Sequence, residues 1–256
     1  MPPTANDVQA CASALVGSLG VDERTALRFA IARNGDAQKA EKMCKSDLEW
    51  RAATKPEQIQ QGDVMKVLAS GHWRLLGKTS TDGFAVLFCS LAYWDPTAYD
   101  AAYYGRFVTY FIEAMLRIGE RFVVLLDFKG WRLWHGFHIR KIFALISTLQ
   151  DHYPERLEAA VLTRVPSIFQ ATWVVAKTFI DANTASKIHF TANSPEAEKE
   201  EISRWGAWEV WPAMYGGPAT DAVPVPNVPG EADVDGAPSL NPEATPLASN
   251  PTATDM

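Results

Sequence analysis

Four short apolar segments alternate with stretches of helical periodicity, and this alternation constrains the fold more than any other feature. The apolar segments, each of strand length, span residues 84–91, 122–127, 159–165 and 188–191. The helical stretches span residues 97–118, 135–153 and 167–181. Strands that are apolar throughout are typical of parallel sheets covered on both faces, and the intervening helices supply the crossovers. The pattern therefore predicts an α/β fold with a mostly parallel sheet.

The N-terminal 60 residues carry a helical pattern without strands. Asn34-Gly35 interrupts it once and ends a helix, and Asp36 is suited to cap the next one. The Lys55-Pro56 pair then ends the second helix. We expect three ordered or partly ordered regions: a loosely ordered lead over residues 1–20, a helical module over residues 21–60 and the α/β domain over residues 61–217.

The last segment differs from the rest in composition and charge. From Gly216 onward the chain has six acidic residues, eight of its 16 prolines and no lysine, arginine or aromatic residue. Such a segment buries too little apolar area to offset its ordering entropy, so we expect residues 218–256 to be disordered. Ahead of it, 24 of the 30 acidic residues balance the 24 lysines and arginines. A neutral folded part without a basic stripe argues against binding to nucleic acid.

Cysteine usage and hydropathy indicate the compartment. Cys11, Cys44 and Cys89 are widely spaced and odd in number, which fits reduced thiols better than a disulfide framework. The N-terminus lacks the cationic start of a secretory signal. The most apolar run, residues 84–94, is shorter than the roughly 20 residues of a membrane-spanning helix. We expect a cytoplasmic monomer that contacts membranes transiently.

Catalytic and metal-binding motifs are missing from the sequence. It contains no Gly-x-Ser-x-Gly elbow, no His-Glu-x-x-His and no Cys-x-x-Cys. His135 and His138 have the spacing of two helical ligands, but no third ligand is suggested nearby, so aromatic packing or a surface position is favoured. Asp127-Phe-Lys-Gly130 closes a strand, and we expect its glycine at positive φ. We therefore expect no enzymatic activity, no metal and no cofactor.

The stretch from residue 167 to residue 181 is apolar nearly all round. One stripe of its expected helix holds Phe169, Trp173, Ala176 and Ile180, and a second holds Ile168, Thr172, Val175 and Phe179. Periodicity alone favours a fully buried helix. The alternative is a helix that uses one stripe to hold an apolar ligand.

Several motifs along the chain occur together. They are Leu27-Arg-Phe-Ala-Ile-Ala-Arg-Asn34, Tyr153-Pro-Glu-Arg156, Asp181-Ala-Asn-Thr-Ala-Ser-Lys-Ile188 and Trp211-Pro-Ala-Met-Tyr-Gly-Gly217. In this combination the chain resembles the CRAL-TRIO family of SEC-fourteen-like lipid-transfer proteins. The resemblance implies an N-terminal helical module and a sheet floor, with helices that form a gated hydrophobic lipid pocket. It also implies that the helix at 167–181 is a mobile gate over that pocket.

The resemblance also implies the site residues. In relatives that bind phosphatidylinositol, an Arg-Lys pair, a glutamate, a threonine and a lysine hold the head group. The matching positions here are Arg33, Asn34, Glu155, Thr184 and Lys187, and Asn34 removes one phosphate cation from the pattern. The implied gate and pocket-lining residues are Ile168, Phe169, Thr172, Trp173, Val175, Phe179, Phe122 and Val124.

The expected function is a non-enzymatic lipid carrier that transfers phosphatidylinositol between membranes or presents it to lipid kinases. Phe122 and Val124 stand where relatives that bind phosphatidylcholine carry two hydroxyl residues, so exchange of a choline lipid is not expected. One alternative is a carrier or sensor of a neutral hydrophobic ligand, such as a sterol, a tocopherol or a retinoid. A second alternative is an interaction module with a vestigial pocket, whose acidic tail recruits proteins.

Overall fold

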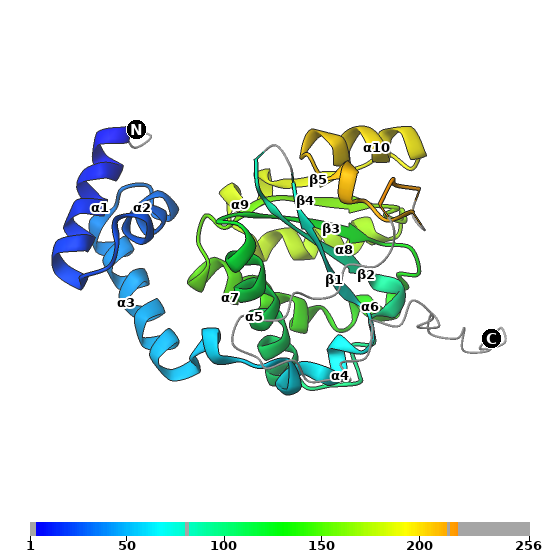
Figure 1. Cartoon of the computed structure of the whole chain (residues 1–256), viewed down its shortest axis with the longest axis horizontal. Helices are drawn as coiled ribbons and strands as arrows, with labels where there is room; N and C mark the ends of the chain where they lie inside the picture. Colours follow the sequence, from blue (N-terminus) through cyan, green and yellow to red (C-terminus); the bar gives the residue numbers. More distant parts are fainter. Residues whose placement is uncertain (1–3, 80–81, 214–215, 220–256) are drawn as a thin grey trace.

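The computed structural model describes residues 4–79, 82–213 and 216–219 (Figure 1). Three N-terminal helices lie at one side of an α/β domain that is built on a five-stranded sheet. The disorder that we predict for residues 218–256 falls almost wholly outside the described residues.

The N-terminal module consists of α1 (Ala5–Leu19), α2 (Glu23–Ala32) and α3 (Ala37–Thr54). Asn34 and Gly35 have φ values of 52° and 73°, and Asp36 caps α3 by accepting from the Lys39 N–H, as predicted. The structure differs at residues 1–20, where a capping box of Thr4 and Asp7 starts a regular helix. This helix is ordered because it buries apolar side chains against α2 and α3, namely Cys11, Ala12 and Leu15.

Polar and aromatic contacts join the module to the α/β domain. Arg51 on α3 pairs with Glu113, with 3.2 Å between Nη1 and Oε1. Asp47 Oδ1 lies 3.1 Å from His152 Nδ1, and the Trp50 ring stacks on the His152 ring at 4.0 Å. The module is therefore attached to the α/β domain through α3.

The sheet has the strand order β1-β2-β3-β4-β5. Its strands are β1 (Trp73–Lys78), β2 (Ala85–Ser90), β3 (Phe122–Asp127), β4 (Leu157–Thr163) and β5 (Ile188–Phe190). All pairs are parallel except β1 with β2, which confirms the predicted α/β class. Strand β1 was not predicted, because its arginine and glycine hide the apolar pattern, and its antiparallel pairing requires no helix before β2.

Helices connect the strands and cover both faces. The α-helices of this domain are α4 (Met65–Leu68), α5 (Ala101–Ile118), α6 (Leu133–Gly136), α7 (Ile139–His152), α8 (Phe169–Ala176), α9 (Ala182–Ser186) and α10 (Pro195–Arg204). The 3-10 turns are η1 (Pro56–Gln58), η2 (Gln61–Val64), η3 (Leu91–Tyr93), η4 (Lys177–Phe179) and η5 (Trp208–Val210). The helix predicted over residues 167–181 is thus shorter than expected, and α10 was not predicted.

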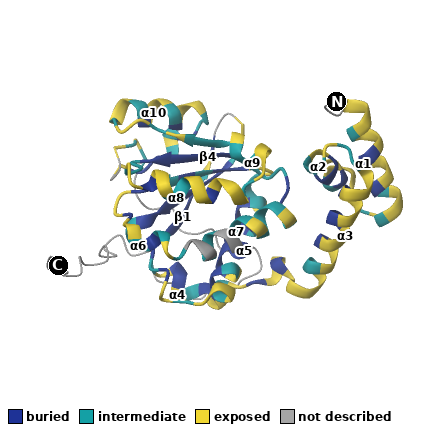
Figure 2. Ribbon diagram, turned by 180° about the vertical axis from the view of Figure 1, so that it is seen from behind, coloured by how far each residue is buried: buried dark blue, intermediate teal, exposed yellow. Residues whose placement is uncertain are grey.

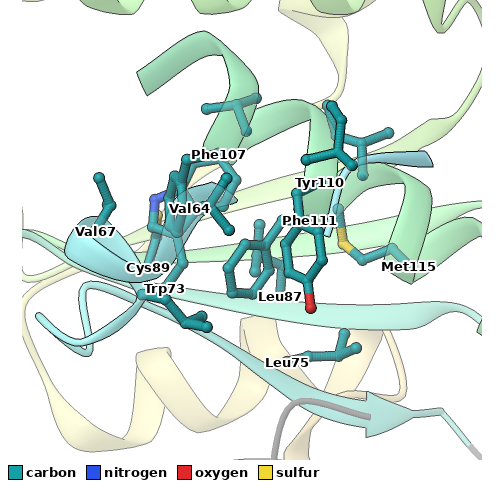
Figure 3. Close-up of a cluster of buried hydrophobic side chains, with 14 of the residues drawn as sticks. Val64, Val67, Trp73, Leu75, Leu87, Cys89, Phe107, Tyr110, Phe111 and Met115 are labelled. Atoms are coloured by element: carbon teal, nitrogen blue, oxygen red, sulfur yellow. The ribbon is translucent and has the colours of Figure 1, made fainter. Parts of the chain in front are cut away.

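Each face of the sheet has its own core. On one face Leu75 and Leu87 pack under α5, which contributes Phe107 and Phe111 (Figure 3). Phe122 belongs to the same core. On the other face the side chains of β2, β3 and β4 pack against α10 and the chain around η5. These side chains are Val86, Phe88, Val123, Leu125, Ala159 and Val161, together with Ile202 and Trp211. Both faces are covered, which explains why the strands are apolar throughout.

Candidate functional site

Glu155 and Lys187 meet at one edge of the sheet. Glu155 lies just before β4 and Lys187 lies directly before β5, and these two strands pair in parallel. The amino ends of neighbouring parallel strands lie side by side, so the two side chains come together. Lys187 Nζ lies 3.1 Å from Glu155 Oε2, and both side chains are mostly buried. Glu155 has a φ of 57°, so the turn ahead of β4 is an unusual conformation for a residue with a side chain.

Helix α9 completes this group. Its cap residue Asp181 accepts from the Thr184 N–H at 2.9 Å and from the Thr184 hydroxyl at 2.7 Å. Asn183 Nδ2 donates to Glu155 Oε1 at 2.7 Å. Although burial acts to raise it, the pKa of Asp181 lies below its ordinary value because Thr184 and Gln150 donate hydrogen bonds to its carboxylate. Asn183 was not predicted as a site residue, since no spacing in the sequence connects it with Glu155.

Arg33 and Asn34 lie in the turn between α2 and α3. The Arg33 guanidinium donates to the carbonyl of Ala32 at 3.1 Å. Within the described residues, the structure records no contact between these two side chains and the Glu155–Lys187 pair. Helix α2 approaches the turn before β4 through Arg28. Burial and the nearby Arg156 charge lower the pKa of Arg28 to about 10. The role expected of Arg33 and Asn34 therefore stays a prediction.

The segment expected to be the gate is α8 with η4, residues 169–179, which we call the gate segment. Phe169 and Ala176 are its buried residues, while Thr172 and Trp173 are half-buried. Phe169 packs edge-on against Phe128, with 4.5 Å between ring centroids. Much of the α8 ribbon is coloured as exposed in Figure 2. The exposed large apolar residues here are Ile168 just ahead of the segment, Val174, Val175 and Phe179.

Helix α6 also carries exposed apolar side chains and lies against the gate segment. A side chain at Gly136 would come within 3.3 Å of Thr172 Oγ1, so α6 packs closely on the gate segment. Phe137, directly after α6, is 77% exposed, and Leu133 is also exposed. His135 between them is buried and stacks on Trp94 at 5.5 Å, so the structure shows the aromatic packing favoured for it over metal binding.

Half-buried apolar side chains lie between the gate segment and the sheet. Val124 on β3 belongs to this group, whereas Phe122 on the same strand face is fully buried under α5. The other half-buried members are Leu126, Ile142, Leu157, Trp173 and Ile188. All of them except Trp173 lack a polar side-chain atom, so this strip suits hydrocarbon. The pocket expected here stays a prediction.

Features of other functional classes are also relevant here. Among the described residues, no group of three or more histidine, cysteine, aspartate or glutamate side chains is arranged to hold a metal ion. No described helix is long and apolar enough to cross a membrane. The three cysteines are buried and carry free thiols.

Several known proteins are similar to this chain in sequence. The chain is 26% identical over 211 residues to the human "Alpha-tocopherol transfer protein-like", covering 79% of this chain and 60% of the relative. It is 29% identical over 188 residues to "Phosphatidylinositol transfer protein CSR1" from Eremothecium gossypii, covering 68% and 43%. "Protein real-time" from Drosophila melanogaster is 24% identical over 223 residues, covering 76% and 32%. The chain thus spans between a third and three fifths of the length of these relatives.

A solved structure and a family model complete the comparison. The crystal structure of Sfh5 superposes with a TM-score of 0.55 at 18% identity, covering 70% of this chain and 68% of that one, and supports the fold alone. The family model described as "CRAL/TRIO domain" matches residues 74–217, which is more than half of the chain. The sheet, the helices that cover it and the strand-edge pair all lie within this range or border it, and the chain belongs to the CRAL/TRIO domain family of lipid-binding proteins.

Proposed function

We propose that the chain is a non-enzymatic carrier that binds phosphatidylinositol and either transfers it between membranes or presents it to lipid kinases. The observation that carries this proposal is the meeting of Glu155 and Lys187 beside Thr184. A phosphoinositol head group needs a cation for its phosphate and an acceptor for its ring hydroxyls. Lys187 supplies the first and Glu155 the second. The relative named for phosphatidylinositol transfer, CSR1, supports the same reading.

The ion pair suits an exchange of partners at this site. Lys187 and Glu155 pair at 3.1 Å, and Asn183 adds a second donor to the carboxylate. A lipid phosphate competes for the ammonium, while Glu155 keeps its bond from Asn183 and turns its freed oxygen to a ring hydroxyl. One charge-assisted hydrogen bond replaces another, so the partly buried charges stay paired throughout.

Arg33 belongs to the proposal as a second cation for the phosphate. It reaches the site if the N-terminal module moves closer to α9 when lipid binds. Asn34 cannot supply a charge, so we expect weaker head-group binding than a full Arg-Lys pair would give.

Moving the lipid requires apolar surroundings at every stage. Each methylene that passes from hydrocarbon into water costs about 0.8 kcal/mol, so a diacyl lipid with about 30 of them faces roughly 25 kcal/mol. The half-buried strip between the sheet and the gate segment offers such surroundings on the protein side. The exposed apolar residues of α8 and α6 offer a surface that docks on the bilayer, so the segment opens only against hydrocarbon.

Transfer of fluorescent phosphatidylinositol between vesicles tests the proposal. We expect the wild-type chain to transfer it, and Lys187→Ala and Glu155→Lys to reduce the rate by about tenfold to a hundredfold, the worth of one hydrogen bond to a charged group. Lys45→Ala on the exposed side of α3 is the matched control and should transfer normally. Equal rates for Lys187→Ala and the control would contradict the head-group assignment.

A second candidate is a carrier of a neutral hydrophobic ligand. It is favoured by Phe122 and Val124, which offer no hydrogen bond to a choline-lipid phosphate, and by the tocopherol transfer-like relative. The same vesicle assay with labelled tocopherol discriminates the two. Tocopherol transfer that Lys187→Ala leaves unchanged, without phosphatidylinositol transfer, would establish the second candidate.

The C-terminal tail allows a test of the remaining alternative, an interaction module with a vestigial pocket. Deleting the chain after Ala219 removes the acidic segment and keeps the bridge between Ala219 and Pro212. A carrier keeps its full transfer rate after this deletion. A module that recruits proteins through its tail loses its partner instead.

A further inference from the structure

The link between β4 and the gate segment holds an unusual backbone conformation. Strand β4 ends at Thr163, the gate segment begins at Phe169, and Arg164 between them has a φ of 55°. Residues with a Cβ rarely adopt positive φ, and arginine is not among the few types enriched there. Such a residue persists only where the surrounding structure holds it.

Two acidic side chains from different elements hold Arg164. Its Nε lies 2.8 Å from Oδ1 of Asp127, the last residue of β3, and its Nη2 lies 3.5 Å from Oε1 of Glu198 on α10. Asp127 on β3 pairs with Thr163 on β4, and Arg164 directly follows Thr163. Arg164 is therefore close to Asp127. The same Oδ1 of Asp127 also accepts from the Lys129 N–H at 2.8 Å. The sheet edge and α10 are thus joined through one guanidinium.

Both acids are buried at the point where they meet the arginine. Asp127 is 1% exposed and Glu198 is 9% exposed. Burial raises the pKa of both carboxyls, and the Arg164 charge counteracts that rise in each. Removing the guanidinium would leave two buried carboxylates without their cation, so the contact is costly to break.

The link borders an open hollow on the α10 side. This cavity of about 300 Å³ is lined by residues 164–166, residues 193–195 and Glu198. The backbone of the link makes a long hydrogen bond there, from Asn193 Nδ2 to the Val165 carbonyl at 3.5 Å. The link can therefore shift into this space without displacing packed side chains.

The opposite end of the gate segment has a polar anchor of its own. Asp181 caps α9 and accepts a hydrogen bond from Gln150 on α7. Between the two ends, few side chains of the segment are buried, and Trp173 rests edge-on against Phe190 at 5.1 Å. The gate segment is thus held by polar contacts at both ends and packs lightly between them. This arrangement allows its middle to move while its ends stay in place.

We propose that Arg164 is a positioning residue which, through Asp127 and Glu198, fixes the start of the gate segment in its closed pose. This inference rests on the proposed function in so far as the segment is a gate. The sequence pattern alone shows nothing of it, because the three residues are separated by more than 30 positions each. Cutting the anchor should make the segment open more often without changing the sheet beneath it.

Hydrogen exchange of the purified full chain tests the anchor without any lipid. Arg164→Gly keeps the positive φ at low cost and removes the guanidinium. We expect exchange in residues 169–179 to rise about tenfold, the worth of one charge-assisted hydrogen bond, while β2 and β3 keep their rates. Arg164→Lys keeps the charge and should recover part of the protection. Arg204→Ala, which removes another arginine paired with a glutamate of α10, is the control and should behave as wild type.

The outcomes separate this inference from the proposed function. Unchanged exchange in Arg164→Gly, or a rise that spreads equally over β2 and β3, overturns the anchor. Where the wild-type chain also carries phosphatidylinositol, Arg164→Gly should release it about tenfold faster and bind the same amount at saturation. A wild type that carries no lipid contradicts the proposed function, while the exchange result still decides on the anchor.

Discussion

Helices α5 and α8 are both rich in apolar residues, but their surroundings differ. In α5 half of the residues are buried, including Phe107, Val108 and Phe111, under the sheet and the turns before β1. In α8 two residues are buried, while Val174 is 68% exposed and Val175 is also exposed. A protein rarely leaves such a surface uncovered without a use for it. From this difference we infer that α5 stabilises the domain through its buried side chains. We propose that the exposed side chains of α8 contact the lipid bilayer.

The largest expected effect lies in α5. Phe111→Ala removes a fully buried ring that packs on Trp73 and Phe107, and leaves a cavity in the core. We expect a loss of about 3–5 kcal/mol in the free energy of unfolding. Urea denaturation followed by circular dichroism measures it. A loss below about 1 kcal/mol would show that α5 is not the core helix described here.

A matched pair of valines sharpens the comparison. Val108 on α5 is 1% exposed, and Val174 on α8 is 68% exposed. Val108→Ala should cost about 2 kcal/mol from lost burial and cavity formation. Val174→Ala should change stability by less than about 0.5 kcal/mol, because it loses little burial and alanine favours a helix. Equal costs in the same urea titration would mean that α8 is packed in solution.

The exposed face of α8 should matter for membranes instead. Val174→Asp places a charge where we propose contact with hydrocarbon, and it should weaken binding to phosphatidylcholine vesicles about tenfold or more. Co-sedimentation with vesicles measures the change, and Val174→Ala serves as the milder control. Undiminished binding by Val174→Asp would place the membrane contact elsewhere.

The last prediction concerns pH and the contact of α5 with His72. His72 contacts Tyr104 of α5 through Nε2, and burial lowers the pKa of His72 to about 3. Below the ordinary histidine pKa of about 6.5, the unfolded chain binds a proton that the folded chain refuses. Stability should therefore fall as the pH drops from about 6.5 toward 3, by at most about 1.4 kcal/mol per pH unit from this residue.

His72→Gln tests this slope. Urea denaturation at several pH values should show a shallower decline for the variant than for the wild type. Burial also lowers the pKa of His135, so some decline remains. An identical slope in both proteins would show that His72 is protonated in the folded state.

The sequence predicted the elements that repeat a simple period and missed those defined by their partners. The four parallel strands appear within two residues of the predicted bounds, because apolar runs of this length have few other solutions. Strand β1 was missed because its identity depends on pairing with β2. Helix α10 begins with the capping residue Ser194 followed by Pro195. This pair is a start signal that the sequence contains and that was overlooked.

The site residues also fall into those that the sequence predicted and those that it missed. The meeting of Glu155 and Lys187 follows from two motifs placed ahead of neighbouring parallel strands. Asn183 and Arg164 were missed because their partners lie 28 to 37 positions away, and no local pattern encodes those distances. Periodicity alone also favoured a fully buried gate helix, and the structure shows an exposed outer face.

Native mass spectrometry of the full chain, purified from a eukaryotic host, tests the central claim most directly. We expect a species heavier than the polypeptide by one phosphatidylinositol molecule, and we expect Lys187→Ala to lose most of that species while Lys45→Ala retains it. A wild-type chain that carries only its own mass, in a preparation that also fails to take up phosphatidylinositol from vesicles, would contradict the account.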